Sequence, residues 1–244
     1  MKAMVLAAGL GTRLRPLTDD RPKALVEIHG HALLEITLLR LREYGIKEVI
    51  VNAHHFAERM VEYLGEHRNF GMKIEVSRED VLLDTGGGLK KAGWFFQDTP
   101  EPFLVHNVDV LSNIDLGRMV DAHHVSGALA TLAIQKRETS RYLLFDDRML
   151  LCGRRKGIDG EPEIARPAKM QRAFAFSGIH VISPRLLNLI SEEGIFSIID
   201  VYLRLAAAGE KIAGFRADEY YWRDLGTPKS MEQAAQDVEN RLVS

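Results

Sequence analysis

Short apolar runs alternate with amphipathic stretches through the first 136 residues, and this alternation constrains the fold more than any other feature. Leu34, Leu38 and Leu41 recur at the spacing of one helix face, and Gly45 marks the expected end of that helix. Strands that alternate with helices favour a parallel sheet covered on both faces. We therefore predict an α/β fold with a Rossmann-like, mostly parallel mixed sheet flanked by helices. The expected strands are 2–8, 48–51, 73–76, 103–105 and 128–134; the further helices are 57–64, a short one after a glycine-rich loop at 86–88, and 116–124.

The pattern from residue 137 onward is less regular. We expect a hairpin of 142–145 with 150–151, and a polar surface loop over 153–169 that carries the basic cluster 154–156. Two strands, 173–176 and 179–182, are separated by Gly178, and a helix at 198–208, a strand at 220–222 and a helix at 231–242 follow. Since no linker interrupts the chain, we predict a single domain over 1–244 with two halves, 1–136 and 137–244.

Charge and cysteine content exclude several classes of protein. The 32 basic and 34 acidic side chains give a formal net charge of -2, which argues against a nucleic-acid-binding protein but leaves room for small phosphorylated ligands. Cys152 is the single cysteine, so the chain forms no internal disulfide. The apolar run at the N-terminus stops at Gly9, too short for a secretion signal, and no stretch reaches the roughly 18 apolar residues of a membrane span. We expect a cytoplasmic protein with no membrane partner; its oligomeric state stays open, a homo-oligomer included.

A glycine-containing loop with two cations follows the first expected strand. Without a Cβ, the backbone amides at Gly9 and Gly11 can approach a phosphate closely. The dinucleotide fingerprint is excluded because its third glycine would fall at Leu14, and no glycine-lysine pair is followed by Ser or Thr as a Walker A loop requires. Arg13 and Lys23 suit phosphate oxygens. A simple turn whose cations face solvent is the alternative.

Two aspartates are candidate metal ligands. Asp109 comes just past the end of a buried strand, where a carboxylate suits Mg²⁺ held together with substrate phosphates. Asp224 precedes Gly226 near the last helix and is a candidate second ligand. The alternatives are a helix cap or solvated turn for Asp109, and for the second motif a capping role, since Thr227 before Pro228 is a good helix start.

Together these motifs resemble the sugar-1-phosphate nucleotidyltransferases, in their short form. The resemblance rests on a Gly-Thr-Arg-Leu-x-Pro-Leu-Thr signature at 11–18, on Pro22-Lys23, and on matches at 84–88, 109, 177–179 and 222–227. It implies condensation of a nucleoside triphosphate with a sugar-1-phosphate, giving a nucleotide-sugar and pyrophosphate. N-acetylmuramate-1-phosphate uridylyltransferases are the most similar members. Mannose-1-phosphate or heptose-1-phosphate guanylyltransferases are the alternative.

The resemblance also implies roles for individual residues. Arg13 and Lys23 are expected to be catalytic, Asp109 and Asp224 to bind Mg²⁺, and Asn107 and Gly178 to contact the sugar. The halves 1–136 and 137–244 would bind nucleotide and sugar, respectively. The expected nucleotide-binding residues are Ala8, Gly9, Gly11, Thr12, Thr85, Gly86, Gly87 and Gly88.

Two departures from the family pattern stand out. The family places glycine before the metal-binding aspartate, whereas this chain has Val108, whose branched side chain resists a positive φ. We therefore expect the turn to take another shape or Asp109 to point differently, and a catalytically weak regulatory protein that binds nucleotide-sugars stays an alternative. The usual Glu-Lys sugar-binding pair has no counterpart over 164–169, so the sequence does not identify the sugar.

Overall fold

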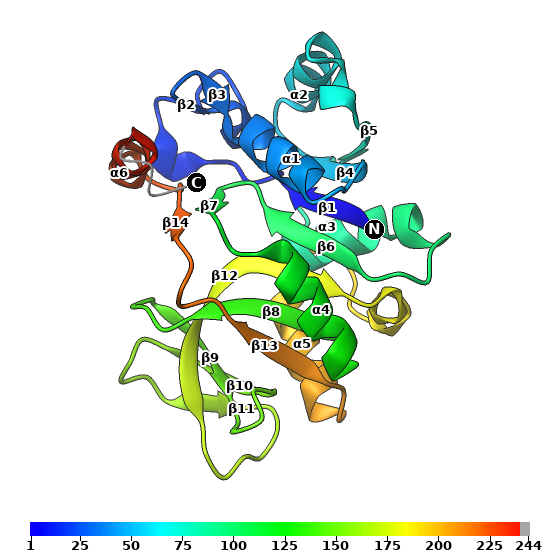
Figure 1. Cartoon of the computed structure of the whole chain (residues 1–244), viewed down its shortest axis with the longest axis vertical. Helices are drawn as coiled ribbons and strands as arrows, with labels where there is room; N and C mark the ends of the chain where they lie inside the picture. Colours follow the sequence, from blue (N-terminus) through cyan, green and yellow to red (C-terminus); the bar gives the residue numbers. More distant parts are fainter. Residues whose placement is uncertain (240–244) are drawn as a thin grey trace.

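The computed structural model describes residues 1–239 and has one ten-stranded mixed sheet at its centre (Figure 1). Its N-terminal part is parallel, because each of these strands is followed by a crossover that returns the chain to the same end of the sheet. The carboxyl ends of these strands therefore share one edge, where ligands bind in such folds. The parallel strands, in spatial order, are β5 (Lys73–Arg78), β4 (Glu48–Ala53), β1 (Lys2–Leu6) and β6 (Phe103–Asn107).

The long strand β12 (Arg172–Ile182) joins this part to the rest of the sheet. Its C-terminal half runs antiparallel to β6 and its N-terminal half antiparallel to β9, with an irregularity between Phe176 and His180. On its other side lies β8, which pairs in parallel with β13. The remaining strands of this part are β8 (Ala130–Gln135), β9 (Arg141–Phe145), β10 (Leu151–Lys156), β11 (Pro162–Ile164) and β13 (Ile212–Arg216).

Helices cover both faces of the sheet, and alternate residues of β1 contact the two cores. Ala3 and Val5 belong to one hydrophobic cluster and Met4 to the other, as expected for a strand buried on both faces. The first cluster includes α1 (Leu33–Glu43), α2 (Ala57–Glu66), α4 (Leu116–Ser126) and α6 (Pro228–Glu239); the second includes α3 (Asp84–Ala92) and α5 (Ile198–Ala207).

The α/β fold with a mixed, mainly parallel sheet and flanking helices is confirmed, but three local predictions are wrong. Residues 86–88 lie inside α3 rather than in a loop. The expected surface loop 153–169 contains most of β10 and all of β11. The two strands expected around Gly178 form the single strand β12, in which Gly178 has a φ of 73°.

Smaller differences concern the bounds of the last predicted elements and several short strands that were not predicted. The strand predicted at 220–222 lies at β14 (Trp222–Asp224), and the last helix begins at Pro228. Residues 240–242 of that predicted helix lie outside the described residues. Strands β13, β7 (Val110–Ser112) and the short pair β2 (Glu27–Ile28) and β3 (His31–Ala32) were not predicted.

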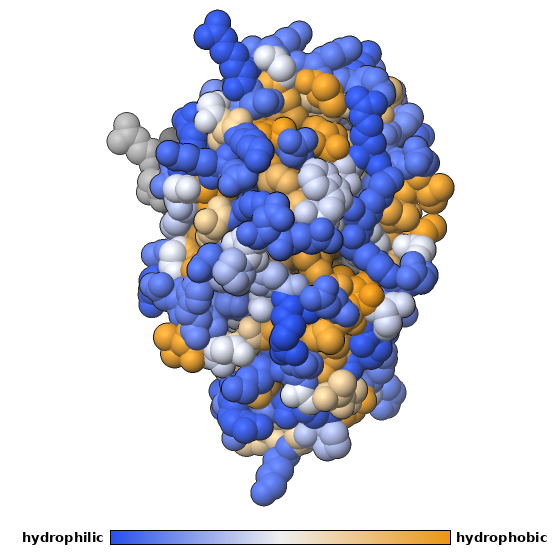
Figure 2. Space-filling view, turned by 90° about the vertical axis from the view of Figure 1, so that its right-hand side faces the viewer, coloured by the Kyte–Doolittle hydropathy of each residue, from blue (hydrophilic) through white to orange (hydrophobic). Residues whose placement is uncertain are grey.

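The surface drawn in Figure 2 mixes hydrophilic and hydrophobic residues, as ordinary folded domains do. Within residues 1–239, no helix is both long enough and apolar enough to cross a bilayer. The division at residue 136 into two binding halves stays a prediction.

Candidate active site

The first loop turns back on itself so that Lys23 lies beside Gly11. Gly11 has a φ of 64°, and a Cβ there would lie 2.9 Å from Thr18 Cγ2 and 3.0 Å from Lys23 Cβ. Thr18 Oγ1 also donates to the carbonyl of Gly11 over 3.0 Å. A side chain at position 11 would therefore be strained and would push Lys23 away.

Asp109 emerges at the edge of the sheet directly after β6. The amide of Val108 donates to the carbonyl of Leu6 over 3.1 Å, which continues the hydrogen bonding between β6 and β1 by one residue. Val108 is buried, and it is not among the described residues with a positive φ. The turn thus takes a shape that a β-branched residue accepts, as expected from the absence of glycine.

A small two-stranded sheet brings Asp224 to Asp109. Strand β14 runs antiparallel to β7 with Asp224 opposite Val110, and the amide of Leu225 donates to the carbonyl of Asp109 over 2.8 Å. The Asp224 carboxylate also accepts a hydrogen bond of 2.9 Å from the amide of Gly226. The backbones of Asp109 and Asp224, which are 115 residues apart in the sequence, therefore lie side by side at one edge.

The two predicted catalytic cations reach the same edge. Lys23 is only 8% exposed, and its ammonium forms an ion pair with the Asp109 carboxylate. A Cβ on Gly226 would lie 2.5 Å from Nη2 of Arg13 and 2.7 Å from Oδ1 of Asp224. Both of these side chains therefore lie over Gly226. The structure brings the four charged residues singled out from the sequence into one cluster.

The donor set fits Mg²⁺. Magnesium is usually held by one or two carboxylates together with substrate phosphates and water, so Asp109 and Asp224 suffice without a third protein ligand. Within the part of the chain that the structure describes, no group of three or more His, Cys, Asp or Glu residues is placed to hold a metal.

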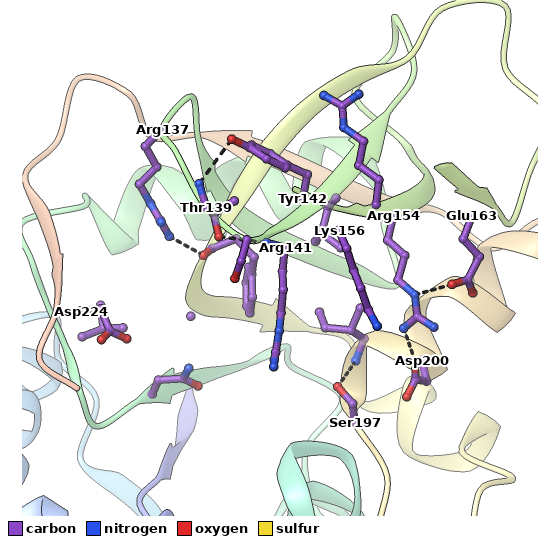
Figure 3. Close-up of a pocket in the computed structure, with 18 of the residues that line it drawn as sticks. Arg137, Thr139, Arg141, Tyr142, Arg154, Lys156, Glu163, Ser197, Asp200 and Asp224 are labelled. Carbon is purple, nitrogen blue, oxygen red and sulfur yellow. Dashed lines mark hydrogen bonds and ion pairs between the residues drawn. The ribbon is translucent and has the colours of Figure 1, made fainter. Parts of the chain in front are cut away.

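A cavity of about 1010 Å³ opens from this cluster toward β9, β10 and α5 (Figure 3). Arg13, Asp224, Asn107 and Gly178 all line it. A Cβ on Gly178 would lie 2.9 Å from Asn107 Nδ2, so the positive φ and the close approach both require glycine. Oδ1 of Asn107 is buried without a hydrogen-bond partner among the described residues. The two predicted sugar-binding residues thus contact each other at the wall of the cavity.

Arg137 and Trp222 form a further part of the wall. Arg137 was not singled out from the sequence, and Trp222 was included only within the 222–227 motif, without a role. The guanidinium of Arg137 lies 3.6 Å from the centre of the Trp222 ring, and its Nη2 donates to the carbonyl of Phe176 over 2.8 Å. The indole nitrogen donates to the carbonyl of Ser177. Burial lowers the pKa of Arg137 to about 10, against the opposing effect of Asp224, so the guanidinium is charged at neutral pH. Its Nε has no hydrogen-bond partner in the described structure.

The predicted nucleotide-binding residues do not line this cavity. The amides of Gly86 and Gly87 donate to the carbonyl of Phe196, and Thr85 Oγ1 accepts from the amide of Ile198. A Cβ on Gly88 would lie 2.8 Å from both Asn52 Nδ2 and Glu79 Oε1. These contacts account for the glycines by helix packing, and their role toward a nucleotide stays a prediction.

The other predicted nucleotide contacts belong to the loop after β1. Ala8 is buried, whereas Gly9 and Thr12 are exposed. A Cβ on Gly9 would meet no atom within 4 Å. Gly9 and Thr12 are thus accessible beside Arg13, as nucleotide-binding residues must be, and their role also stays a prediction.

The basic cluster 154–156 was also misjudged, because it was placed in a solvated loop. Arg154, Arg155 and Lys156 lie on β10, and all three line the cavity. The hairpin predicted just before these residues was the one sequence feature that could have indicated their position on the sheet. Extending its second strand would have placed these cations on the sheet.

Comparisons with known proteins agree with this geometry. A family model described as "Nucleotidyl transferase" matches residues 2–241. N-acetylmuramate alpha-1-phosphate uridylyltransferase of Caulobacter vibrioides is 34% identical and covers 93% of each chain. D-glycero-alpha-D-manno-heptose 1-phosphate guanylyltransferase of Aneurinibacillus thermoaerophilus is 28% identical, over 99% of this chain and 100% of its own. The crystal structure of HddC from Yersinia pseudotuberculosis complexed with GMP-PN has the same fold, with a TM-score of 0.76, 20% identity and coverage of 97% and 99%.

Proposed function

Since the chain belongs to the nucleotidyl transferase family, as a sugar-1-phosphate nucleotidyltransferase, we propose that it joins UTP to N-acetylmuramate 1-phosphate and releases pyrophosphate. The single observation that carries the proposal is that the pairing of β7 with β14 brings Asp224 next to Asp109, with Arg13 and Lys23 beside them. The uridylyltransferase of Caulobacter vibrioides supports this choice of substrates.

In the proposed reaction, an oxygen of the sugar phosphate forms a bond to the α-phosphorus of the triphosphate. The bond from that phosphorus to the bridging oxygen breaks, and its electron pair leaves with pyrophosphate. Both reactants are anions, so their repulsion is the first obstacle. Arg13, with its forked guanidinium, holds the departing pyrophosphate, and the nearly buried Lys23 holds the α-phosphate or the attacking phosphate.

Asp109 and Asp224 are the residues that would hold Mg²⁺, which would supply further neutralisation of phosphate charge. The Lys23 ammonium forms an ion pair with the Asp109 carboxylate, so a bound Mg²⁺ would share the charge of that carboxylate with Lys23. The attacking phosphate is already deprotonated near neutral pH, and the site accordingly needs no general base. What the chain supplies is charge and alignment.

The cavity next to this cluster is the proposed sugar site. Asn107 and Gly178 lie at its wall close to Val110, the residue opposite Asp224. Trp222 presents a ring that Arg137 covers on one side. Oδ1 of Asn107 and Nε of Arg137 are buried without a hydrogen-bond partner in the described structure. A small shift of either side chain would let Asn107 accept from a sugar hydroxyl and Arg137 donate to a phosphate oxygen.

A guanylyltransferase is the second candidate, because the relative from Aneurinibacillus thermoaerophilus matches this chain from end to end. A grid of nucleoside triphosphates against sugar 1-phosphates, read by pyrophosphate release, decides between them. We expect the highest kcat/KM for UTP with N-acetylmuramate 1-phosphate. Preference for GTP with mannose or heptose 1-phosphate would replace that assignment. Tight binding without release for every pair would favour a regulatory protein.

A further inference from the structure

Two cations without an ion-pair partner lie side by side on the wall of the cavity formed by β9 and β10. Arg141 on β9 lies directly opposite Lys156 on β10 in the antiparallel register. Both line the cavity, and Figure 3 shows both side chains pointing into it from the sheet. Like charges directly opposite one another in a sheet destabilise it. Both side chains are exposed to solvent, so this repulsion is partly screened, and no contact among the described residues offsets the remainder.

No acidic residue compensates this pair. In residues 1–239, neither the Arg141 nor the Lys156 side chain has an ion-pair or hydrogen-bond partner, although Glu161 lines the same cavity. The neighbouring cation shows the contrast. Arg154 forms ion pairs with both Glu163 and Asp200.

The cavity as a whole has a surplus of positive charge. Six basic side chains line it against four acidic ones. Arg154 is neutralised by its two partners, and Asp224 belongs to the proposed metal pair. Arg141 and Lys156 lie on the hairpin strands, whereas Arg13 and Asp224 lie at the edge of the parallel strands. The surplus therefore extends to a part of the cavity separate from the proposed phosphoryl-transfer cluster.

We propose that Arg141 and Lys156 bind a second anionic group of the sugar, so that the enzyme selects sugar 1-phosphates that carry an additional carboxylate or phosphate. This inference rests on the proposed function and deepens it. The carboxylate of N-acetylmuramate 1-phosphate is one such group, and the second phosphate of a sugar bisphosphate is another. The bound anion would remove the repulsion between the two cations.

The first experiment is calorimetric binding to the full-length protein. The probes are N-acetylmuramate 1-phosphate against N-acetylglucosamine 1-phosphate, and glucose 1,6-bisphosphate against glucose 1-phosphate. We expect the wild type to bind at least one acidic member about tenfold to a hundredfold more tightly than its neutral partner. A difference in the first pair identifies the preferred anion as a carboxylate, and a difference in the second pair identifies it as a phosphate.

The variant Arg141→Gln/Lys156→Gln is expected to lose this preference while its affinity for the neutral sugars and for UTP is unchanged. The matched control is Lys169→Gln/Arg172→Gln, which removes the same charge from positions that do not line the cavity, and it should keep the preference. Because the test variant removes a like-charge pair, its melting temperature should be at least that of the wild type, which checks that it folds.

Two results would overturn the inference. One is equal affinity of the wild type for acidic and neutral probes in both pairs. The other is a variant that weakens the acidic and neutral members alike. Turnover separates this failure from that of the proposed function: pyrophosphate release without acid preference refutes the subsite alone. Acid preference in binding without release for any nucleotide refutes the proposed function alone.

Discussion

The ammonium of Lys23 forms an ion pair with the carboxylate of Asp109, joining two loops that lie 86 residues apart in the sequence. The Lys23 side chain is nearly buried and that of Asp109 mostly buried. Removing either partner would therefore leave a charge in a partly buried site and lower the stability of the fold. Lys23 also packs against Gly11, so this contact ties the glycine loop to the end of β6.

A double-mutant cycle tests that relationship. Asp109→Asn should lower the free energy of unfolding by about 1–3 kcal/mol, because it leaves a nearly buried ammonium without its charged partner. In Lys23→Met/Asp109→Asn, that unpaired charge is gone, so the loss should be smaller than the sum of the two single losses. Urea denaturation of the four proteins measures this. Additive losses would show that the pair contributes no coupling energy.

Gly226→Ala tests the packing of Arg13 and Asp224. The new Cβ would lie within 2.7 Å of atoms of both side chains, so at least one must move. We expect kcat/KM to fall by about 100-fold, as displacements of about 1 Å do at such sites. The melting temperature should change little, because the ends of the two side chains can swing aside.

The matched control is Gly65→Ala in α2, where an added Cβ meets no atom within 4 Å. It should leave turnover unchanged and slightly raise stability. Equal turnover in both alanine variants would mean that Arg13 does not act where the structure places it.

Trp222 and Arg137 should determine affinity for the sugar phosphate. Trp222→Leu removes the ring on which the guanidinium lies, and we expect the KM for the sugar 1-phosphate to rise about tenfold because stacked cations contribute up to about 2 kcal/mol. Trp222→Phe keeps a ring and should restore part of that loss. The KM for the nucleotide should be unchanged in both, and a rise in the nucleotide KM alone would contradict the assignment.

Two buried histidines should make stability fall in mild acid. Burial lowers the pKa of His106 to about 3, and the charge of Arg40 contributes to this shift. Burial also lowers the pKa of His180 to about 3, with a smaller contribution from repulsion by His106. Below about pH 6.5 the unfolded chain binds protons that the folded chain excludes. The free energy of unfolding therefore decreases as pH falls, by up to about 1.4 kcal/mol per pH unit for each histidine.

Removing one of these histidines isolates the effect from that of the carboxylates. His180→Gln should give a shallower decline of unfolding free energy between pH 6 and pH 4 than the wild type. The exposed His55→Gln is the control and should keep the wild-type slope. Parallel slopes in all three proteins would show that His180 binds a proton in the folded state.

The parts of the fold that the sequence predicted are those with strong periodicity. Residues 3–8 and 49–51 are continuous apolar runs within the predicted strands, and Leu34, Leu38 and Leu41 follow one helix face. Residues 86–88 were predicted as a loop because glycine has a poor intrinsic helix propensity. The helix nevertheless requires glycine at these positions, because Phe196 and the carbonyl of Gly194 approach too closely for larger side chains.

The candidate site was predictable where a motif marks the end of a strand, as at Arg13, Lys23 and Asp109. Asp224 was only a candidate second ligand, with a capping role for its motif as the alternative, because its place beside Asp109 depends on the unpredicted pairing of β7 with β14. The cations of β10 were missed because three consecutive charges suggest a solvated loop. Their place in the cavity depends on pairing with β9, which local composition does not reveal.

The measurement that tests the central claim most directly is the rate of nucleotide-sugar formation by the wild type and by Arg13→Ala, Lys23→Ala, Asp109→Asn and Asp224→Asn, each with Mg²⁺ and with a chelator. Circular dichroism verifies that each variant is folded. We predict that each substitution lowers kcat by about 100- to 1000-fold, and that the chelator abolishes turnover of the wild type. Near-normal turnover in folded variants, or a wild type indifferent to chelation, would contradict the account.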